Sequence, residues 1–286
     1  MQSIVVFISD LIISSKVEIC ARELGFVFID VLTENRLSSI FGNEETNGSV
    51  SHAKLTNDYL SGRDGALIDF LSSYNPALVI FDLDDRVIPW KDLMTTITSS
   101  PATCRIPIIG FGPHVKPATL KVGMQLGAVA TYPRSQFISK MSELVLRHAK
   151  VVDEKGILNT CQDPLSVHAK QGLELFNQGE YFEAHELLEI AWKADPSPGR
   201  ELYRAILQIG IAYLQIERRN YNSAIKMFLR VRQWISPIPE ICRGVDVADL
   251  RMNAQLVYDA LVALGPDGIA QFDKRLFRPI KFAAKR

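Results

Sequence analysis

An imidazole, a carboxylate and an indole lie close together in the stretch GEYFEAHELLEIAWK, and their types and spacing are suited to chemistry. His185, Glu189 and Trp192 are separated by four and three residues, which places them on one face of an α-helix. Tyr181 and Leu188 fall on the same face, so the stripe is otherwise apolar and should point toward a core. A buried ionisable group without a partner is costly, and His185 and Glu189 therefore need a partner, a ligand or a metal.

Three interpretations of this motif are open at the level of the sequence. The first is a buried structural network in which His185 donates a hydrogen bond to Glu189 or to the amide of Gln208. The second is a bound divalent metal or small anion, and the third is catalysis. We favour the network, whose further members would be Trp192, Tyr181, Gln208 and Glu201.

Metal binding needs more ligands than one helical turn supplies. His and Glu at positions i and i+4 can hold one ion, but zinc requires a third ligand and usually a fourth. Glu186, Glu201 or Glu217 would have to supply them. The segment HELLE also lacks the second histidine of the zinc-protease motif HExxH. No cofactor is therefore predicted beyond a candidate divalent metal at His185 and Glu189.

The composition is that of an ordinary globular chain, long enough for two domains. Of its 286 residues 47% are hydrophobic and 22% charged, and 32 Lys and Arg balance 32 Asp and Glu, which favours neither a nucleic-acid nor a membrane partner. The N-terminal stretch MQSIVVFISDLIISS has no basic leader and is shorter than the roughly 20 apolar residues of a membrane span, which predicts a cytoplasmic protein. Cys20, Cys104, Cys161 and Cys242 have no short spacing and are expected to be free thiols in a reducing compartment.

Residues 1–150 alternate between short apolar runs and segments of helical periodicity. This pattern predicts an α/β domain with a doubly wound parallel sheet of five strands, covered by helices on both faces. The strands are expected at residues 4–8, 26–32, 77–81, 106–111 and 128–132. The helices are expected at residues 11–24, 66–71, 90–98, 117–126 and 134–150, and residues 33–62 should form a long loop or a broken helix.

Three strand ends in this part carry motifs similar to those of response-regulator receiver domains. The motif PALVIFDLDD resembles the strand that presents the phosphoacceptor, IPIIGFGPHV resembles the fourth strand, and LGAVATYPRSQF resembles the fifth strand with its turn. The resemblance spans most of residues 1–148. It implies that Asp82 stands at the phosphoacceptor position and that Asp10 is one of the acids that hold Mg²⁺.

The sequence departs from the receiver pattern at the groups that support phosphorylation. Only Asp10 follows the first strand, where the family usually has a pair of acids. Gly112 replaces the Thr or Ser after the fourth strand, and Arg134 is the basic residue nearest to the expected Lys after the fifth. An aspartyl phosphate would thus lack its usual charge partners. We favour a receiver-like domain that is not switched by phosphorylation; the alternative is a working phosphoacceptor at Asp82.

After the expected linker at residues 151–163 the periodicity is helical. Asp163 and Pro164 should begin the first helix, with Pro at its first position. Helices are predicted at residues 165–176, 180–194, 200–218, 221–235 and 246–264, within an all-α domain at residues 164–265. Their short connections indicate a five-helix bundle. The sequence GEYFEA recurs 40 residues later as RNYNSA, which is typical of tetratricopeptide-like hairpins.

The pattern GLELFNQGEYFEAHELLEIAWK, followed by a helix that ends near RRNYNSA, resembles the bacterial and archaeal family called domain of unknown function 309. Its hallmark HxxxExx(W/Y) corresponds to His185, Glu189 and Trp192, and the resemblance covers about residues 165–264. The resemblance implies an all-helical fold and a suggested role of the motif in metal binding. Gln215 stands where many relatives carry a His, and Gln is a poor metal ligand.

Residues 266–286 form a basic and aromatic C-terminal tail. Phe272, Phe277 and Phe282 are interleaved with Lys and Arg, a pattern that could contact nucleic acid or an acidic lipid. The other interpretation is that the aromatic rings pack on the helical domain while the charges stay in water. We favour this packing.

The combined pattern favours a non-enzymatic regulatory or interaction protein in signalling. Its helical domain would present a groove to a protein partner, and we expect neither a membrane nor a nucleic acid as the main partner. The alternative is a metal-dependent enzyme or metal sensor that uses His185 and Glu189. No oligomeric state is predicted.

Overall fold

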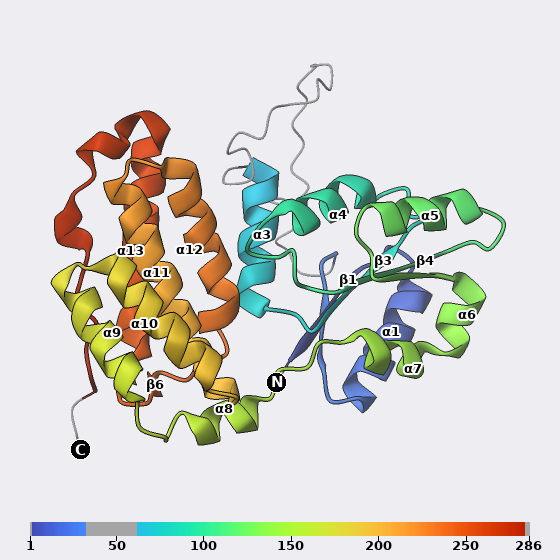
Figure 1. Cartoon of the computed structure of the whole chain (residues 1–286). Coiled ribbons are helices and arrows are strands. Elements are labelled where there is room, and N and C mark those ends of the chain that lie inside the picture. Colours follow the sequence, from blue (N-terminus) through green and yellow to red (C-terminus); the bar gives the residue numbers. More distant parts are fainter. Residues whose placement is uncertain (1, 33–61, 284–286) are drawn as a thin grey trace. The chain divides into compact units, whose positions relative to one another are not determined.

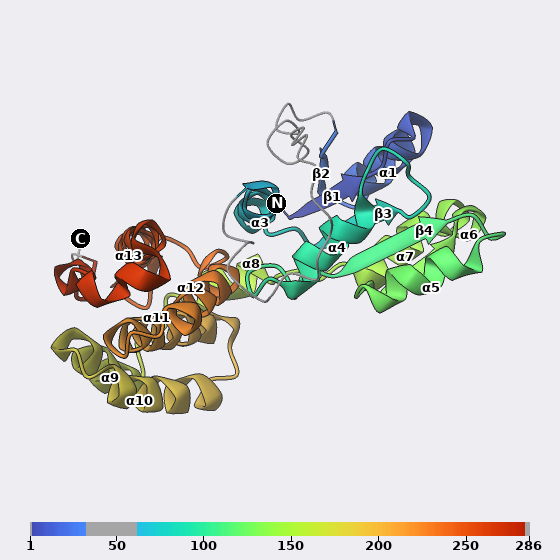
Figure 2. The ribbon, with the colours of Figure 1, turned by 90° about the horizontal axis from the view of Figure 1, so that it is seen from above.

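Five short parallel strands build the sheet of the N-terminal unit (Figure 1). The computed structural model describes residues 2–32 and 62–283, and the chain divides into two compact units at residues 1–152 and 153–286. The strands are β1 (Ser3–Phe7), β2 (Val27–Asp30), β3 (Leu78–Asp82), β4 (Ile108–Gly112) and β5 (Ala130–Pro133). Their order is β2-β1-β3-β4-β5, part of which Figure 2 shows. This order confirms the predicted five-stranded parallel sheet and has the receiver-like topology.

Helices cover both faces of this sheet (Figure 1). One face carries α3 (Gly62–Tyr74), α4 (Trp90–Ser99) and α5 (Pro117–Gln125), and the other carries α1 (Leu11–Glu23), α6 (Arg134–Ser139) and α7 (Met141–His148). Side chains of β1 alternate between the two hydrophobic clusters, with Val5 and Phe7 on one side and Ile4 and Val6 on the other. The long loop expected at residues 33–62 falls almost entirely outside the described residues.

The second unit is helical, as predicted. Its five long helices are α9 (Val167–Gln178), α10 (Tyr181–Ala194), α11 (Glu201–Glu217), α12 (Tyr221–Ile235) and α13 (Val247–Gly268). Each of these helices packs on the next one in the chain. The helix α11 is central, because it contacts both α10 and α12 and has ten buried residues. No helix in the described ranges has the length and apolar character needed to cross a membrane.

Several short elements of this unit differ from the sequence-based expectation. Residues 151–163, expected as a linker, contain α8 (Glu154–Thr160). The first long helix begins at Val167 rather than at Pro164, because the side chain of Ser166 caps it by accepting the N–H of Ala169. A two-stranded hairpin, β6 (Ile241–Cys242) and β7 (Val245–Asp246), precedes α13. The tail continues through the 3₁₀ turns η3 (Ile269–Gln271) and η4 (Lys274–Leu276). A further 3₁₀ turn, η2 (Pro198–Arg200), precedes α11.

Two glycines shape the α9–α10 hairpin. Gly179 ends α9 in the left-handed conformation with φ of 88°, which allows the tight turn into α10. Gly172 lies where the two helices approach closely, and a Cβ atom there would lie 2.8 Å from Cγ of Leu188 and 3.3 Å from the carbonyl oxygen of Ala184. The packing of this hairpin therefore requires a residue without a side chain at position 172.

Replacing Gly172 with Ala should lower the free energy of unfolding by about 1–3 kcal/mol, because the added methyl group overpacks the α9–α10 contact. The matched control is Gly210→Ala in α11, where the new Cβ would meet the Phe176 ring at an ordinary 3.4 Å. This control should be neutral or stabilising because Ala favours the helix by up to about 1 kcal/mol. Urea unfolding followed by circular dichroism measures both, and equal losses would contradict the close approach at Gly172.

Cys161, directly after α8, and Cys242, in β6, form a disulfide with their Cα atoms 4.4 Å apart. The prediction of four free thiols is therefore wrong for this pair, whereas Cys20 and Cys104 are free. A separation of 81 residues offers no local spacing signal, and only the folded chain brings the two sulfur atoms together.

Replacing Cys242 with Ser should lower the stability of the helical unit by about 2–4 kcal/mol, because the crosslink that closes a long loop is lost. Cys104→Ser is the control, since this exposed thiol has no disulfide partner. Urea unfolding of both variants and of the wild type, with and without dithiothreitol, measures the effect. A count of four reactive thiols in the denatured, unreduced chain is the result that speaks against the disulfide.

Candidate functional sites

The carboxylate of Asp82 lies at the carboxyl end of β3, the edge where ligands of such sheets bind. The residue is only 3% exposed. Arg134, the first residue of α6, places its Nη2 atom 2.6 Å from Oδ2 of Asp82. The backbone N–H of Asp84 donates to the other oxygen at 2.9 Å. The carboxylate is thus matched by a cation and a hydrogen-bond donor from its own unit.

The same guanidinium also approaches Asp10. Its Nη1 atom lies 3.7 Å from Oδ2 of Asp10, whose Oδ1 accepts the N–H groups of Ile12 and Ile13 at the start of α1. The guanidinium carbon of Arg134 also lies 5.6 Å from the centre of the Phe111 ring. Two carboxylates and an aromatic face therefore hold Arg134 at this edge of the sheet.

The electrostatics of Asp82 depend on this contact. Burial raises the pKa of Asp82, and the hydrogen bond from Asp84 and the charge of Arg134 act against that rise. Burial also acts to raise the pKa of the neighbouring Asp85, but hydrogen bonds from Ser9 and from its own loop outweigh it and lower that pKa. The ionised form of Asp82 is thus the less well stabilised of the two.

These carboxylates do not fit the magnesium site that the receiver resemblance implies. Asp10 and Asp82 already face the guanidinium of Arg134, and Asp85 accepts the backbone N–H of Ser9 at 2.8 Å. Magnesium requires near-octahedral oxygen ligands. Within residues 2–32 and 62–283, no group of three or more His, Cys, Asp or Glu is placed to hold a metal ion.

Gly112 stands at the end of β4, where receivers carry a hydroxyl group. A Cβ atom at this position would lie 3.5 Å from Cδ2 of Leu120, which is an ordinary contact. The packing therefore leaves room for the first side-chain atom of Ser or Thr. The loss of the hydroxyl is a change in chemistry that the fold does not impose.

The His–Glu–Trp motif lies on α10, at the margin of the core. Tyr181 is buried, whereas His185, Glu189 and Trp192 are half-buried. Oε2 of Glu189 pairs with Nζ of Lys193 at 3.1 Å, on the exposed side of the helix. In the described part of the chain, no hydrogen bond links His185 to Glu189. The two residues share a helical face, but they do not form the expected network.

Gln208 lies in α11, the helix that packs on α10. Oε1 of Gln208 is buried and accepts no hydrogen bond from any described residue. A divalent metal at His185 and Glu189 stays a prediction, and no third His, Cys, Asp or Glu among the described residues joins these two in a metal-ligand group.

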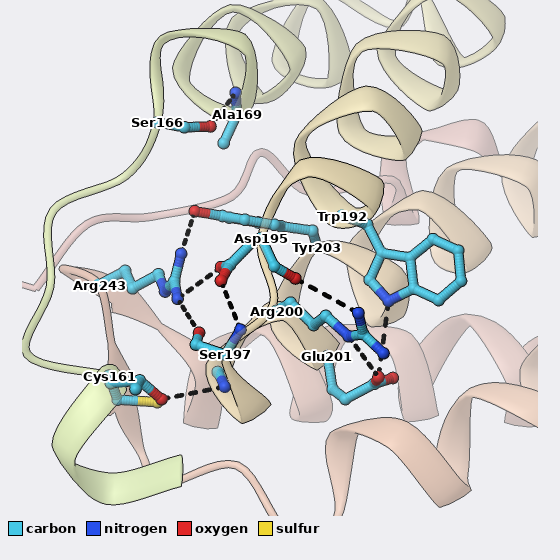
Figure 3. Close-up of polar contacts among 12 residues, drawn as sticks. Cys161, Ser166, Ala169, Trp192, Asp195, Ser197, Arg200, Glu201, Tyr203 and Arg243 are labelled. Carbon is cyan, nitrogen blue, oxygen red and sulfur yellow. Dashed lines mark hydrogen bonds and ion pairs between the residues drawn. The ribbon is translucent and has the colours of Figure 1, made fainter. Parts of the chain in front are cut away.

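Trp192 lies beside Arg200 and Glu201 (Figure 3). Arg204 connects it to a second indole, that of Trp234. The guanidinium carbon of Arg204 lies 4.8 Å from the centre of the Trp192 ring and 3.7 Å from that of Trp234. Glu201 accepts hydrogen bonds from Nη1 of Arg204 at 3.4 Å and from Nε1 of Trp192 at 3.5 Å. Arg200 also lies over the Trp192 ring, at 5.3 Å. Stacking of this kind contributes about 0.5–2 kcal/mol per contact, which assigns Trp192 and Glu201 a structural role.

A second polar cluster surrounds Arg243, which is only 8% exposed (Figure 3). Its Nη2 lies 2.7 Å from Oδ2 of Asp195 and 2.9 Å from Oγ of Ser197, and its Nη1 donates to the hydroxyl of Tyr203. Its backbone N–H donates to the carbonyl of Cys161 at 2.7 Å. Burial acts to raise the pKa of Asp195, but its hydrogen bonds and Arg243 lower it. This cluster ties α11 and the preceding loop to the disulfide.

No sequence motif marks the Arg243 cluster. The pair Arg243 and Gly244 forms the turn between β6 and β7, with φ of 53° and 80°. An Arg-Gly pair in ICRGVD is a weak hairpin signal, and it says nothing about where the guanidinium points. The partners of Arg243 come from segments far away in the sequence, so only the fold reveals them.

Residues 169–227 match the family described as Domain of unknown function (DUF309). The match includes α10 and α11 in full, almost all of α9 and the first half of α12, and therefore His185, Glu189 and Trp192. The comparisons with curated proteins and with solved structures gave no match to the chain. The helical unit is thus similar to this family over these residues, and the family description names no activity.

Replacing Arg134 with Met should destabilise the N-terminal unit by about 2 kcal/mol at pH 7, because the Asp82 side chain, 4% exposed, loses its cation. The pKa of Asp82 is raised in the folded state, so above pH 3.8 the folded chain binds more protons than the unfolded chain, and stability falls as the pH rises. Without Arg134 this pKa should rise further. The destabilisation should therefore be smaller at a pH of about 4.5 than at pH 7, because protonation of Asp82 becomes more favourable as the pH falls.

Urea unfolding at the two pH values measures this effect. The control is Arg147→Met, which breaks an exposed pair between Arg147 and Glu143 in α7 and should change stability by less than about 0.5 kcal/mol. Equal losses in the two variants at pH 7, or a loss that does not depend on pH, would count against the role of Arg134.

Proposed function

We propose that the chain is a non-enzymatic regulatory or interaction protein whose receiver-like unit acts without phosphorylation. The observation that supports this proposal is the ion pair between Arg134 and Asp82, with the two atoms 2.6 Å apart and the carboxylate almost fully buried. The cation that pairs with Asp82 is thus supplied by the unit itself, from the first residue of α6.

Phosphorylation of Asp82 would have to break this arrangement. Both oxygens of Asp82 already accept hydrogen bonds, from Arg134 and from the N–H of Asp84, and Asp10 faces the same guanidinium. A phosphorylation switch works because the added negative charge of the phosphoryl group is bound by new hydrogen-bond donors or cations. Gly112 has no hydroxyl group that could donate a hydrogen bond to such a phosphoryl group. These features support a unit with one stable charge state.

The helical unit supports a binding role rather than catalysis. In the described residues, His185 has no carboxylate bonded to it, and the acid and base of the Arg243 cluster are used in internal contacts. No observation on these residues favours the metal-dependent alternative.

Incubation with Mg²⁺ and acetyl phosphate, or with beryllofluoride, tests the proposal. We expect the treatment to leave the intact mass and the amide NMR spectrum of the wild type as unchanged as it leaves those of Asp82→Asn, because Asp82 is paired with Arg134. The Asp82→Asn variant controls for labelling elsewhere. A phosphoryl adduct, or a spectral change around Asp84 that needs Asp82, would show a working phosphoacceptor and defeat the proposal.

A further inference from the structure

The C-terminal segment of residues 272–283, called the strap below, lies across the ends of α9, α10 and α11. In Figure 1 it is the red chain that runs down beside α9. Phe272 and Ile280 are buried, whereas Arg278, Pro279 and Phe282 are exposed. The strap is therefore held at a few anchor points and is in contact with solvent between them.

The side chain of Asn177 grips the backbone of the strap. Its Nδ2 donates to the carbonyl of Ile280 at 3.1 Å, and its Oδ1 accepts the N–H of the same residue at 2.7 Å. A side-chain amide that pairs with both polar groups of one residue recognises an extended backbone. Ile280 itself is 4% exposed, so its side chain fills the position that this grip creates.

An aromatic floor receives the second anchor. The ring of Phe277 stacks on Tyr213 with the ring centres 4.2 Å apart, and it meets the ring of Tyr181 edge-on at 6.0 Å. Tyr181 and Tyr213 also contact each other and Phe176, at 5.4, 5.3 and 5.7 Å. The floor is thus held together without Phe277. Burial raises the pKa of Tyr181 to about 12, so its hydroxyl is neutral at physiological pH.

The end of the strap adds a short third strand to the β6–β7 hairpin. The backbone N–H of Asp246 donates to the carbonyl of Lys281 at 2.9 Å, and the N–H of Ala283 donates to the carbonyl of Gly244 at 2.8 Å. An antiparallel bridge pairs Val245 with Phe282. Pairing of this kind recognises a backbone, as when a peptide adds a strand to a sheet edge.

Acidic side chains flank the strap at both ends. Lys274 pairs with Glu217 at 3.0 Å, and Lys281 pairs with Asp249 at 2.8 Å. The lysine of each pair is exposed, so the pairs contribute little to stability but select a basic segment in a defined orientation. The groove therefore has a backbone grip, an aromatic floor and two carboxylates, each complementary to one feature of an extended basic peptide.

We propose that this groove is a peptide-binding site and that the strap is an internal ligand which a partner protein displaces. The partner segment would be extended and basic, with an aromatic residue, an aliphatic residue three positions later, and a proline between them, as in FRPIK. This inference rests on the proposed interaction role and names its surface and ligand class. It does not depend on the state of Asp82, so the two proposals fail separately.

The probe is a fluorescent peptide with the sequence of residues 272–283, titrated against the full chain by anisotropy. We expect weak binding to the wild type, because its own strap occupies the groove, and binding about tenfold tighter to Phe277→Ala, whose strap is weakened. Adding Asn177→Ala to that variant should reverse the gain. Phe282→Ala is the matched control, because this exposed ring leaves the strap anchored and should bind as the wild type does.

A folded Phe277→Ala variant without a gain in affinity overturns the proposal, as does a gain that survives the loss of Asn177. Dimers that form at higher protein concentration by exchanging their straps would show that the groove binds a second copy of this chain. That result would overturn the proposal of a different partner protein. If Phe277→Ala does not fold, native-state hydrogen exchange on the wild type tests whether the strap detaches. The amides of Ile280 and Ala283 should then exchange at least about tenfold faster than those of α11. Exchange of all of them at one rate would make the strap part of the core.

Discussion

The burial of one carboxylate at the end of β3 is the constraint on which the N-terminal unit depends. A charge removed from water needs a partner within the fold, and Arg134 supplies it because α6 begins directly where β5 ends. The planar guanidinium also reaches Asp10, which a compact lysine ammonium would do less well. The first turn of α1, the end of β3 and the start of α6 are thereby held by one side chain.

In the second unit too, buried charged groups have partners within the fold, but only part of the His185, Glu189 and Trp192 motif takes part in these contacts. Trp192 and Glu201 belong to a cluster with Arg204, and both Nη atoms of Arg243 have partners within the unit. His185 and Glu189 lie at the margin instead, so the three residues of the motif do not act as one structural set. The helix α12 has Ile225 and Leu229 where α10 has His185 and Glu189. The hairpin architecture does not require those two polar residues.

The sequence predicted what depends on local patterns and missed what depends on distant contacts. Continuous apolar runs predicted all five strands, because parallel strands covered on both faces have no polar side. The helical periodicity likewise located the five long helices. The start of α9 was misplaced because the capping hydroxyl of Ser166 outweighs the preference of Pro164 for a first turn.

The candidate sites were harder to predict, for a physical reason. Asp82 and Arg134 were both noticed, but their pairing joins residues 52 positions apart, and Cys161 and Cys242 are 81 positions apart. Contacts of this kind depend on how elements pack, which spacing does not record. The partial burial of His185 and Glu189 had the same origin, since a helical face says which residues point one way and not how deeply they are covered.

In each unit a binding position is filled by a group of the chain itself, Arg134 beside Asp82 and the strap over the aromatic floor. These two groups differ in how firmly they are held. Arg134 contacts a carboxylate that is 4% exposed, so its removal would leave a buried charge without a partner. The strap leaves behind an aromatic floor whose rings still pack on each other, and the lysines that it pairs with Glu217 and Asp249 are themselves exposed. Detaching it exposes apolar surface that a similar segment can cover again. The pair of Arg134 and Asp82 is therefore the more firmly held of the two internal contacts, and the strap is the one that an interaction can replace.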